Sequence, residues 1–168
     1  MSDAFHKATV QQMGGMLTAL AKILDKVEQH CEAKKIDPSV LLNARLFPDM
    51  FDFKRQVQMT ADFAKGAAGR LSGQEPPAFA DTETTIPELK GRIAKTIDYL
   101  KTIGPAEFAG AMTREITIAP GGNKMTFSGE DFANRFSLPN FYFHMTSAYA
   151  ILRKNGVEVG KWDFMGRA

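Results

Sequence analysis

Residues 3–33 carry the pattern that most constrains the fold of this chain. Apolar side chains recur there at alternating steps of three and four, which is the spacing of one face of an α-helix. Charged residues, among them Lys22 and Asp25, occupy the other face, so the apolar face must pack against neighbouring helices. Gly14 and Gly15 each lower helix propensity by about 1 kcal/mol, which predicts a close helix crossing or a kink there. The apolar stripe consists of Val10, Met13, Leu17, Leu20, Leu24, Val27 and Cys31.

A second helix is predicted over residues 49–71. Pro48 and Asp49 form a typical helix start, and Gly73 stands where a helix stop is expected. The string GAAG at residues 66–69 makes the second half of this helix thin, so we expect a neighbouring segment to approach it closely. The predicted buried face consists of Phe53, Val57, Ala61, Ala64, Ala68 and Leu71.

A proline-rich polar segment, QEPPAFADTETT, connects the second helix to a third one. Thr85 and Glu88 match the capping-box pattern that opens a helix, and Gly104 followed by Pro105 ends it. The buried face of this third helix is predicted to be Leu89, Ile93, Ile97 and Leu100.

The string REITIAPGGNKMTFSG changes from the helical period to the alternation of a strand. Ile116 and Ile118 precede a PGGN turn, and Met125 and Phe127 follow it, which predicts a β-hairpin. Two strands alone are only marginally stable in water, so we expect the hairpin to pack against the helices at one end of the bundle.

A fourth helix is predicted over residues 130–155, with Pro139 inside it. Proline removes one hydrogen bond of the helix, so we expect the helix to bend or restart there. Aromatic and aliphatic side chains cover most of its circumference, which predicts a helix buried on nearly all sides. The tail after Gly156 contains Trp162 and Phe164 and is expected to fold back onto the bundle.

Asn140, His144 and Ser147 form a narrow polar stripe on this apolar fourth helix, because they stand at positions i, i+4 and i+7. A buried polar group without a partner costs about 1–3 kcal/mol, so the stripe must face polar side chains of other helices. Gln56 on the second helix is one candidate partner, and the others are Asp62, Gln11 and Gln12. Together these side chains predict a small polar pocket in the bundle. The predicted ligand-binding residues are His144, Asn140, Gln56 and Tyr149.

Composition excludes several classes of protein. The chain has 168 residues, of which 44% are hydrophobic, and this predicts one domain, residues 1–168, with a real core. The 21 basic and 19 acidic residues give a net charge of +2 without a run of like charges, which argues against nucleic acid as a partner. No apolar signal region or membrane-length apolar segment is seen, so a cytoplasmic protein without membrane contact is expected. The single cysteine, Cys31, excludes an internal disulfide and is expected to be a small buried hydrophobe.

Several long strings resemble the DinB and YfiT-like helical bundles, a superfamily of metalloenzymes, and the resemblance covers essentially the whole chain. These strings are LLNARLFPDMFDFKRQV, FADTETTIPELKGRIAKTIDYL and LPNFYFHMTSAYAILRKNGVEVGKWDF, and they are similar to a branch that is a domain of unknown function. The resemblance implies an all-α fold, namely a four-helix up-down-down-up bundle, often dimeric; here the small β-hairpin lies between helices three and four. In metal-binding members it implies one histidine on helix two and an H-x-x-x-H pair on helix four. Some members are thiol-dependent transferases or isomerases.

This chain departs from that ligand pattern. The second helix contains no histidine, and the positions four residues from His144 are Asn140 and Ala148. Gln56 lies roughly where the ligand of helix two belongs, but a neutral amide is a poor ligand for zinc or nickel. We therefore predict neither a bound metal nor another cofactor.

Three function classes remain open from the sequence. The first is a metal-free module that binds a small polar ligand around His144. The second is an enzyme, such as a divalent-metal or thiol-dependent transferase or isomerase, that uses His144 as a general acid or base or as a metal ligand. The third is a structural protein that acts through homodimer or partner contacts, with His144 as a satisfied core residue. The sequence shows no catalytic triad order and no phosphate-binding glycine loop that would name a reaction.

Overall fold

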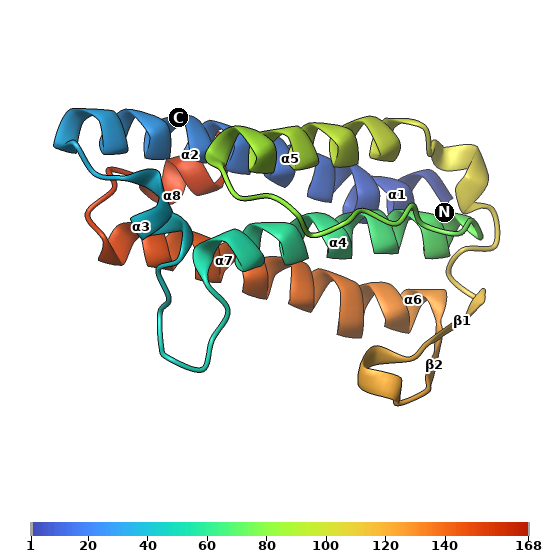
Figure 1. Cartoon of the computed structure of the whole chain (residues 1–168). Coiled ribbons are helices and arrows are strands. Elements are labelled where there is room, and N and C mark those ends of the chain that lie inside the picture. The colour runs from blue at the N-terminus through green and yellow to red at the C-terminus, as the bar shows by residue number, and fades with distance from the viewer. Residues whose placement is uncertain (1, 168) are drawn as a thin grey trace.

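Four long helices lie side by side and account for most of this largely helical structure, a computed structural model that describes residues 2–167. They are α2 (Gln12–Lys34), α4 (Phe53–Ser72), α5 (Ile86–Lys101) and α7 (Leu138–Lys154). Helices α4 and α5 run in the same direction, and α2 and α7 run in the opposite one (Figure 1). Helix α4 makes its most extensive contacts with α7, and α2 packs chiefly on α5. The helical fold class predicted from the sequence is therefore confirmed. No helix among residues 2–167 is long and apolar enough to cross a membrane.

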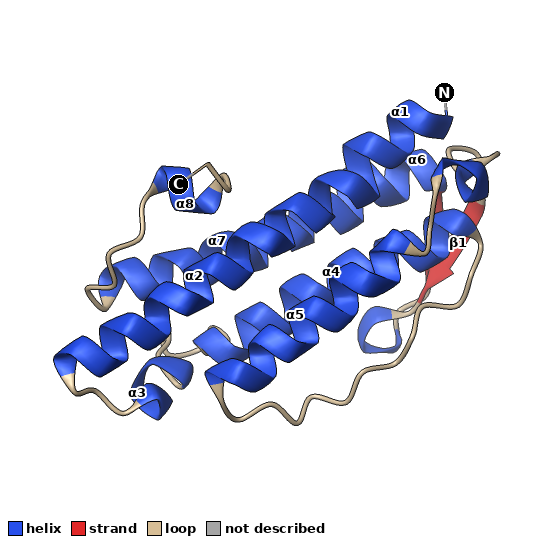
Figure 2. Ribbon diagram, turned by 90° about the horizontal axis from the view of Figure 1, so that it is seen from above, coloured by secondary structure: helices blue, strands red, loops and turns tan. Residues whose placement is uncertain are grey.

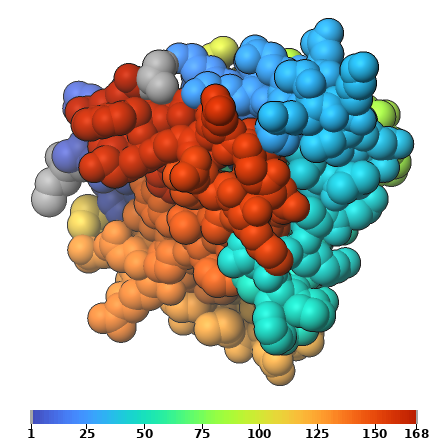
Figure 3. Space-filling view, turned by 90° about the vertical axis from the view of Figure 1, so that its left-hand side faces the viewer, coloured from blue at the N-terminus to red at the C-terminus, as the bar shows by residue number. Residues whose placement is uncertain are grey.

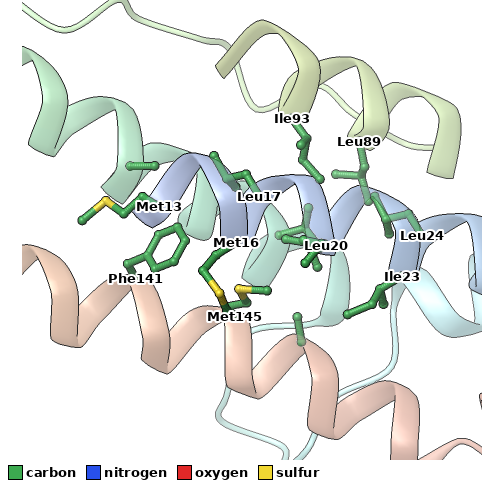
Figure 4. Close-up of a cluster of buried hydrophobic side chains, with 14 of the residues drawn as sticks. Met13, Met16, Leu17, Leu20, Ile23, Leu24, Leu89, Ile93, Phe141 and Met145 are labelled. Atoms are coloured by element: carbon green, nitrogen blue, oxygen red, sulfur yellow. The ribbon is translucent and has the colours of Figure 1, made fainter. Parts of the chain in front are cut away.

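The N-terminal helical region consists of α1 (Ser2–His6), a π-helical stretch (Lys7–Gln11) and α2. All seven residues of the predicted apolar stripe are buried. Figure 4 shows Met13, Leu17, Leu20 and Leu24 of this stripe between α5, with Leu89 and Ile93, and α7, with Phe141 and Met145. Of the two alternatives predicted at Gly14 and Gly15, the kink is not found at the glycines, because α2 is a regular α-helix there and the π-helical stretch ends before them at Gln11. The close crossing is also wrong. A Cβ atom at Gly14 would lie at an ordinary 3.7 Å from Leu100 Cδ1, and one at Gly15 would meet nothing within 4 Å.

The segment between α2 and α4 contains regular structure that no pattern in the sequence analysis predicts. It contains the short helix α3 (Pro38–Leu42), which Asp37 caps by accepting a hydrogen bond from the Ser39 amide at 2.8 Å. Helix α4 starts at Phe53 and not at residue 49, because the carboxylate that caps it belongs to Asp52, which accepts from the Arg55 amide at 2.9 Å.

The body and end of α4 follow the prediction. Its six predicted core residues are fully buried. Gly73 ends the helix in the left-handed conformation, with φ 78°, which a glycine adopts without strain. A Cβ atom at Gly69 would lie only 2.9 Å from the Pro76 nitrogen, so the thin part of α4 does admit a close neighbour, the connection to α5.

This connection, residues 74–84, has no regular secondary structure and runs along the bundle beside α5 (Figure 2). The predicted capping box follows it, since Thr85 accepts from the Glu88 amide and the Glu88 carboxylate accepts from the Thr85 amide. Arg92 of α5 is 2% exposed and holds the connection by a hydrogen bond to the Ala80 carbonyl oxygen and an ion pair with Glu83.

The predicted hairpin is confirmed as β1 (Glu115–Ile118) paired antiparallel with β2 (Met125–Ser128). Ile116 stands opposite Phe127 and is buried, and the Phe127 ring packs on those of Phe132 and Phe136. The hairpin lies at the end of the bundle that also carries α1 (Figure 2). These contacts supply the support that an isolated pair of strands lacks.

The last helical region consists of α6 (Gly129–Asp131), a π-helical stretch (Phe132–Ser137) and α7. Pro139 stands in the first turn of α7, so the predicted interruption takes the form of this π-helical stretch, and the backbone stays helical from it into α7. The prediction that the helix is buried on nearly all sides is wrong, because Phe143 is 55% exposed.

The tail after α7 folds back, as expected, and ends in α8 (Lys161–Phe164), which packs on α2. Figure 3 shows this C-terminal segment seated against the N-terminal part of the chain. An ion pair between Asp163 and Lys26 and the packing of Phe164 on Tyr149 hold it there. Trp162 is 54% exposed and does not serve as an anchor.

Candidate ligand site around His144

His144 and Gln56 meet where the first turn of α4 packs against the second turn of α7. The Nδ1 atom of His144 lies 2.8 Å from Oε1 of Gln56. Both side chains are buried, with 6% and 1% of their surface exposed. The polar stripe of α7 thus faces α4 at this point. The Gln56 amide supplies the hydrogen-bond partner that a buried imidazole requires.

The Gln56 amide fixes the tautomer of His144. Its Nε2 atom donates to the Phe51 carbonyl oxygen at 3.3 Å, so its Oε1 atom is the one that faces the imidazole. A carbonyl oxygen only accepts hydrogen bonds, and Nδ1 of His144 must therefore carry the proton. The Nε2 atom of His144 is left with a lone pair and makes no hydrogen bond within residues 2–167.

Three phenylalanine rings surround the imidazole. Phe51 and Phe63 lie nearly parallel to it, with ring centroids 6.2 and 5.4 Å away, and Phe143 meets it edge-on at 5.3 Å. Phe51 and Phe143 are themselves 45% and 55% exposed. The imidazole therefore lies only one side chain below the surface, in an apolar aromatic setting.

This setting lowers the pKa of His144 from 6.5 to about 4. The main cause is burial, which disfavours the charged imidazolium, and the positive charge of Arg55 adds to the effect. At neutral pH the side chain is thus an uncharged hydrogen-bond acceptor at Nε2.

The other predicted site residues bond elsewhere. Asn140 donates from Nδ2 to the Phe136 carbonyl oxygen at 2.7 Å, within its own helical region, where the π-helical stretch and Pro139 disturb the regular bonding. Tyr149 packs edge-on against Phe164 with centroids 5.7 Å apart. Of the four predicted ligand-binding residues, the structure brings together His144 and Gln56.

Of the remaining candidate partners of the polar stripe, Gln11 is exposed, and Asp62 and Gln12 bond to other side chains. Asp62 forms ion pairs with Arg92 at 2.7 Å and with Lys65 at 2.8 Å. The Gln12 amide donates to the Tyr142 hydroxyl at 3.3 Å. The stripe therefore meets one amide of α4 and not a wider set of polar side chains.

Sequence reasoning missed the aromatic partners of His144. A signal for Phe63 was available, since it stands seven residues after Gln56 and hence on the same face of α4. Phe51 lies outside any regular element, in the segment that precedes α4, so no periodicity places it over the imidazole.

The donor set does not fit the divalent metal ion of the DinB superfamily. Gln56 offers a neutral amide oxygen that already accepts from His144, and Ala148, fully buried on α7, offers no donor. Within residues 2–167 no group of three or more His, Cys, Asp or Glu side chains is arranged to hold a metal ion.

The comparisons with known proteins agree on one family. Residues 5–165 match the family described as Domain of unknown function (DUF1993). A crystal structure of a DinB family member protein from Shewanella denitrificans is similar, with 45% sequence identity and a TM-score of 0.93, over 98% of this chain and 93% of that one. No protein with curated annotation matches this chain. The resemblance predicted from the sequence is confirmed, and the chain belongs to the DUF1993 family and has a DinB-like fold.

Proposed function

We propose that this protein is a metal-free small-molecule-binding module, built on the up-down-down-up four-helix bundle of the DinB superfamily. Nε2 of neutral His144 accepts a hydrogen bond from the polar group of the ligand. The observation that carries the proposal is the 2.8 Å contact between His144 Nδ1 and Gln56 Oε1, because it leaves Nε2 as the acceptor.

The surroundings of Nε2 define the chemistry of the ligand. An uncharged imidazole with a lone pair binds a ligand that carries an O–H or N–H donor. The three phenylalanine rings favour a ligand with an apolar part next to that donor. The exposed Phe51 ring lies over the imidazole, so a modest movement of the segment before α4 gives a ligand access to Nε2 of His144.

The same pKa favours binding over acid–base catalysis. A general acid or base works best when its pKa lies near the working pH. With a pKa of about 4, His144 is a weak base at neutral pH and is almost never protonated. It keeps, however, the full capacity to accept a hydrogen bond.

Nitrogen NMR of the three histidines tests the proposal directly. The spectrum of the uniformly labelled protein is recorded with phenol, which carries an O–H donor, and with anisole, its methyl ether without one. We expect His144 to show the Nδ1–H tautomer, and we expect phenol but not anisole to shift its Nε2 resonance in a saturable way.

The other histidines serve as references in the same spectrum. His6 lies 2.8 Å from the Ile103 carbonyl oxygen through Nε2, so it must show the opposite tautomer and no response to phenol. A His30→Gln variant keeps the His144 response, whereas His144→Phe removes it. Equal shifts with phenol and anisole, or saturable binding of Zn²⁺ at His144 Nε2, contradict the proposal.

The homodimer and the cytoplasmic location remain proposals beside this one. Sedimentation equilibrium over a range of concentrations tests the first. A molecular mass that stays at the 18.5 kDa of one chain contradicts it.

A further inference from the structure

A cavity of about 300 Å³ lies between α4, the π-helical stretch Phe132–Ser137 and the turn of the hairpin. His144 does not line it, and Phe63, whose ring stacks on the imidazole, forms part of its wall. Its volume is at the lower end of the range typical of small-molecule sites. The cavity thus adjoins the site around His144 and shares one residue, Phe63, with it.

The cavity exists because the facing walls differ in bulk. On α4 the wall includes Ala67, whose small side chain leaves space, and Gly66, where an added Cβ atom would lie only 2.7 Å from the Arg70 guanidinium. The opposite wall carries Phe132 and Phe136, whose rings stack with centroids 5.8 Å apart. An aromatic ring or a short aliphatic chain therefore meets mostly apolar surface inside.

Ser137 provides a polar group in this apolar wall. The residue is 1% exposed, and its Oγ atom has no hydrogen-bond partner among the described residues. A serine in a regular helix commonly bonds to the carbonyl oxygen one turn earlier, but this one closes a π-helical stretch and does not. A buried hydroxyl without a partner is unfavourable, and a ligand atom in the cavity would supply the missing partner.

Arg70 provides a positive charge at the same cavity. Within the described part of the chain its guanidinium makes one hydrogen bond, to the Gly66 carbonyl oxygen at 3.2 Å, and no ion pair. Asp62, the acidic residue on the same wall, is already paired with Arg92 and Lys65. The cavity thus offers one unneutralised cation with several free N–H donors.

We propose that this cavity binds a small aromatic carboxylate. Its ring packs against Phe63, Phe132 and Phe136, Arg70 binds its carboxylate, and the Ser137 hydroxyl donates to one of its oxygens. The proposal does not rest on the function proposed for His144. The two sites have Phe63 in common, but Arg70 and Ser137 bind the polar group here, and the ligand has the opposite hydrogen-bonding character.

Phenylacetate is the probe, and phenylacetamide is its uncharged match. Binding is followed by methyl NMR of Met59 and Ile118, which line the cavity from α4 and from the hairpin. We expect phenylacetate to shift both methyl signals in a saturable way and to bind about tenfold more tightly than phenylacetamide, since only the carboxylate pairs with Arg70.

Three variants localise the binding. Arg70→Gln should weaken phenylacetate binding by about tenfold and leave phenylacetamide unchanged. Ala67→Leu should fill the cavity and abolish binding of both probes, with circular dichroism to verify that the helices remain. Arg135→Gln is the matched control, because Arg135 carries the same charge on an exposed side chain of the π-helical stretch and does not line the cavity.

The outcomes separate this inference from the one about His144. A His144→Phe variant should bind phenylacetate as the unchanged protein does, while it loses its response to phenol. The inference is overturned if phenylacetate gives no saturable shift at Met59 and Ile118. It is equally overturned if Arg70→Gln binds phenylacetate as tightly as the unchanged protein does.

Discussion

Two buried polar centres flank α4, one around Arg92 and one around His144. They differ in how many of their polar atoms have a partner within the chain. Arg92 forms ion pairs with Asp62, Asp81 and Glu83 at 2.7 to 3.0 Å. Of its three side-chain nitrogens, only Nε has no hydrogen-bond partner among residues 2–167. His144 has the single bond to Gln56, and its second ring nitrogen bonds to none of the described residues.

The difference indicates two different uses of a buried polar group. The Arg92 centre joins α4, α5 and the connection between them, and its charges are matched within the chain. Burial is costly for such groups, and a nearly complete set of partners keeps the cost low. The His144 centre avoids that cost in another way, by remaining uncharged, and this leaves an acceptor for a molecule from outside.

Breaking the Arg92 centre should give the largest effect. Arg92→Met removes one charge and leaves three carboxylates without it, so we expect the free energy of unfolding to fall by about 3–5 kcal/mol. Urea unfolding followed by circular dichroism measures this. Lys101→Met is the control, since its ion pair with Asp98 is exposed and should contribute less than about 1 kcal/mol. A loss below about 1 kcal/mol for Arg92→Met would show that the centre is not structural.

The pH dependence of stability should reveal the His144 centre. The folded protein resists protonation of His144 down to about pH 4, whereas the unfolded chain takes up the proton near pH 6.5. Stability from this group is therefore complete above pH 6.5 and is lost as the pH falls to about 4, by up to about 3 kcal/mol.

A variant isolates this contribution from that of the carboxylates. Glu83 also loses stabilising interactions on acidification, because its hydrogen bonds with Arg92 help to lower its pKa against the opposing effect of burial. Urea unfolding at a series of pH values is therefore compared between the unchanged protein and His144→Phe/Gln56→Leu, which has no group to titrate at this site. Identical slopes between pH 6.5 and 4 would contradict the burial of a neutral His144.

The smallest expected effect comes from a substitution that places a carboxylate next to His144, as the Arg92 centre has carboxylates next to Arg92. Gln56→Glu places a carboxylate beside Nδ1, which favours the imidazolium, so we expect the pKa of His144 to rise from about 4 towards 6.5. An NMR titration of the three histidines measures this, with His6 and His30 as internal controls. An unchanged pKa of His144 would mean that residue 56 does not face the imidazole.

Much of the architecture was accessible from local patterns. The stripe from Val10 to Cys31, the capping box of Thr85 and Glu88 and the stop at Gly73 all hold, because each depends on spacings within one helix. The pairing of His144 with Gln56 was also among the candidates, since both were assigned to buried helix faces.

The errors occur where a residue has a choice of partners. Asp52 rather than Asp49 caps α4, although both precede an apolar helix face. Asn140 was assigned to the polar stripe by its spacing, yet its side chain donates to the Phe136 carbonyl oxygen of its own helical region. No sequence pattern indicates the burial of Arg92, because an arginine on a helix is normally exposed and its three carboxylate partners lie 9 to 30 residues away in the sequence.

Periodicity and capping are sufficient to predict the four long helices, the hairpin and the burial of most apolar faces, since these patterns act over a few residues. The tertiary structure alone decided that Arg92 is neutralised, that His144 stays uncharged with a free acceptor, and that a cavity opens beside Phe63. Those properties depend on distances and desolvation between helices, and a one-dimensional pattern does not contain them.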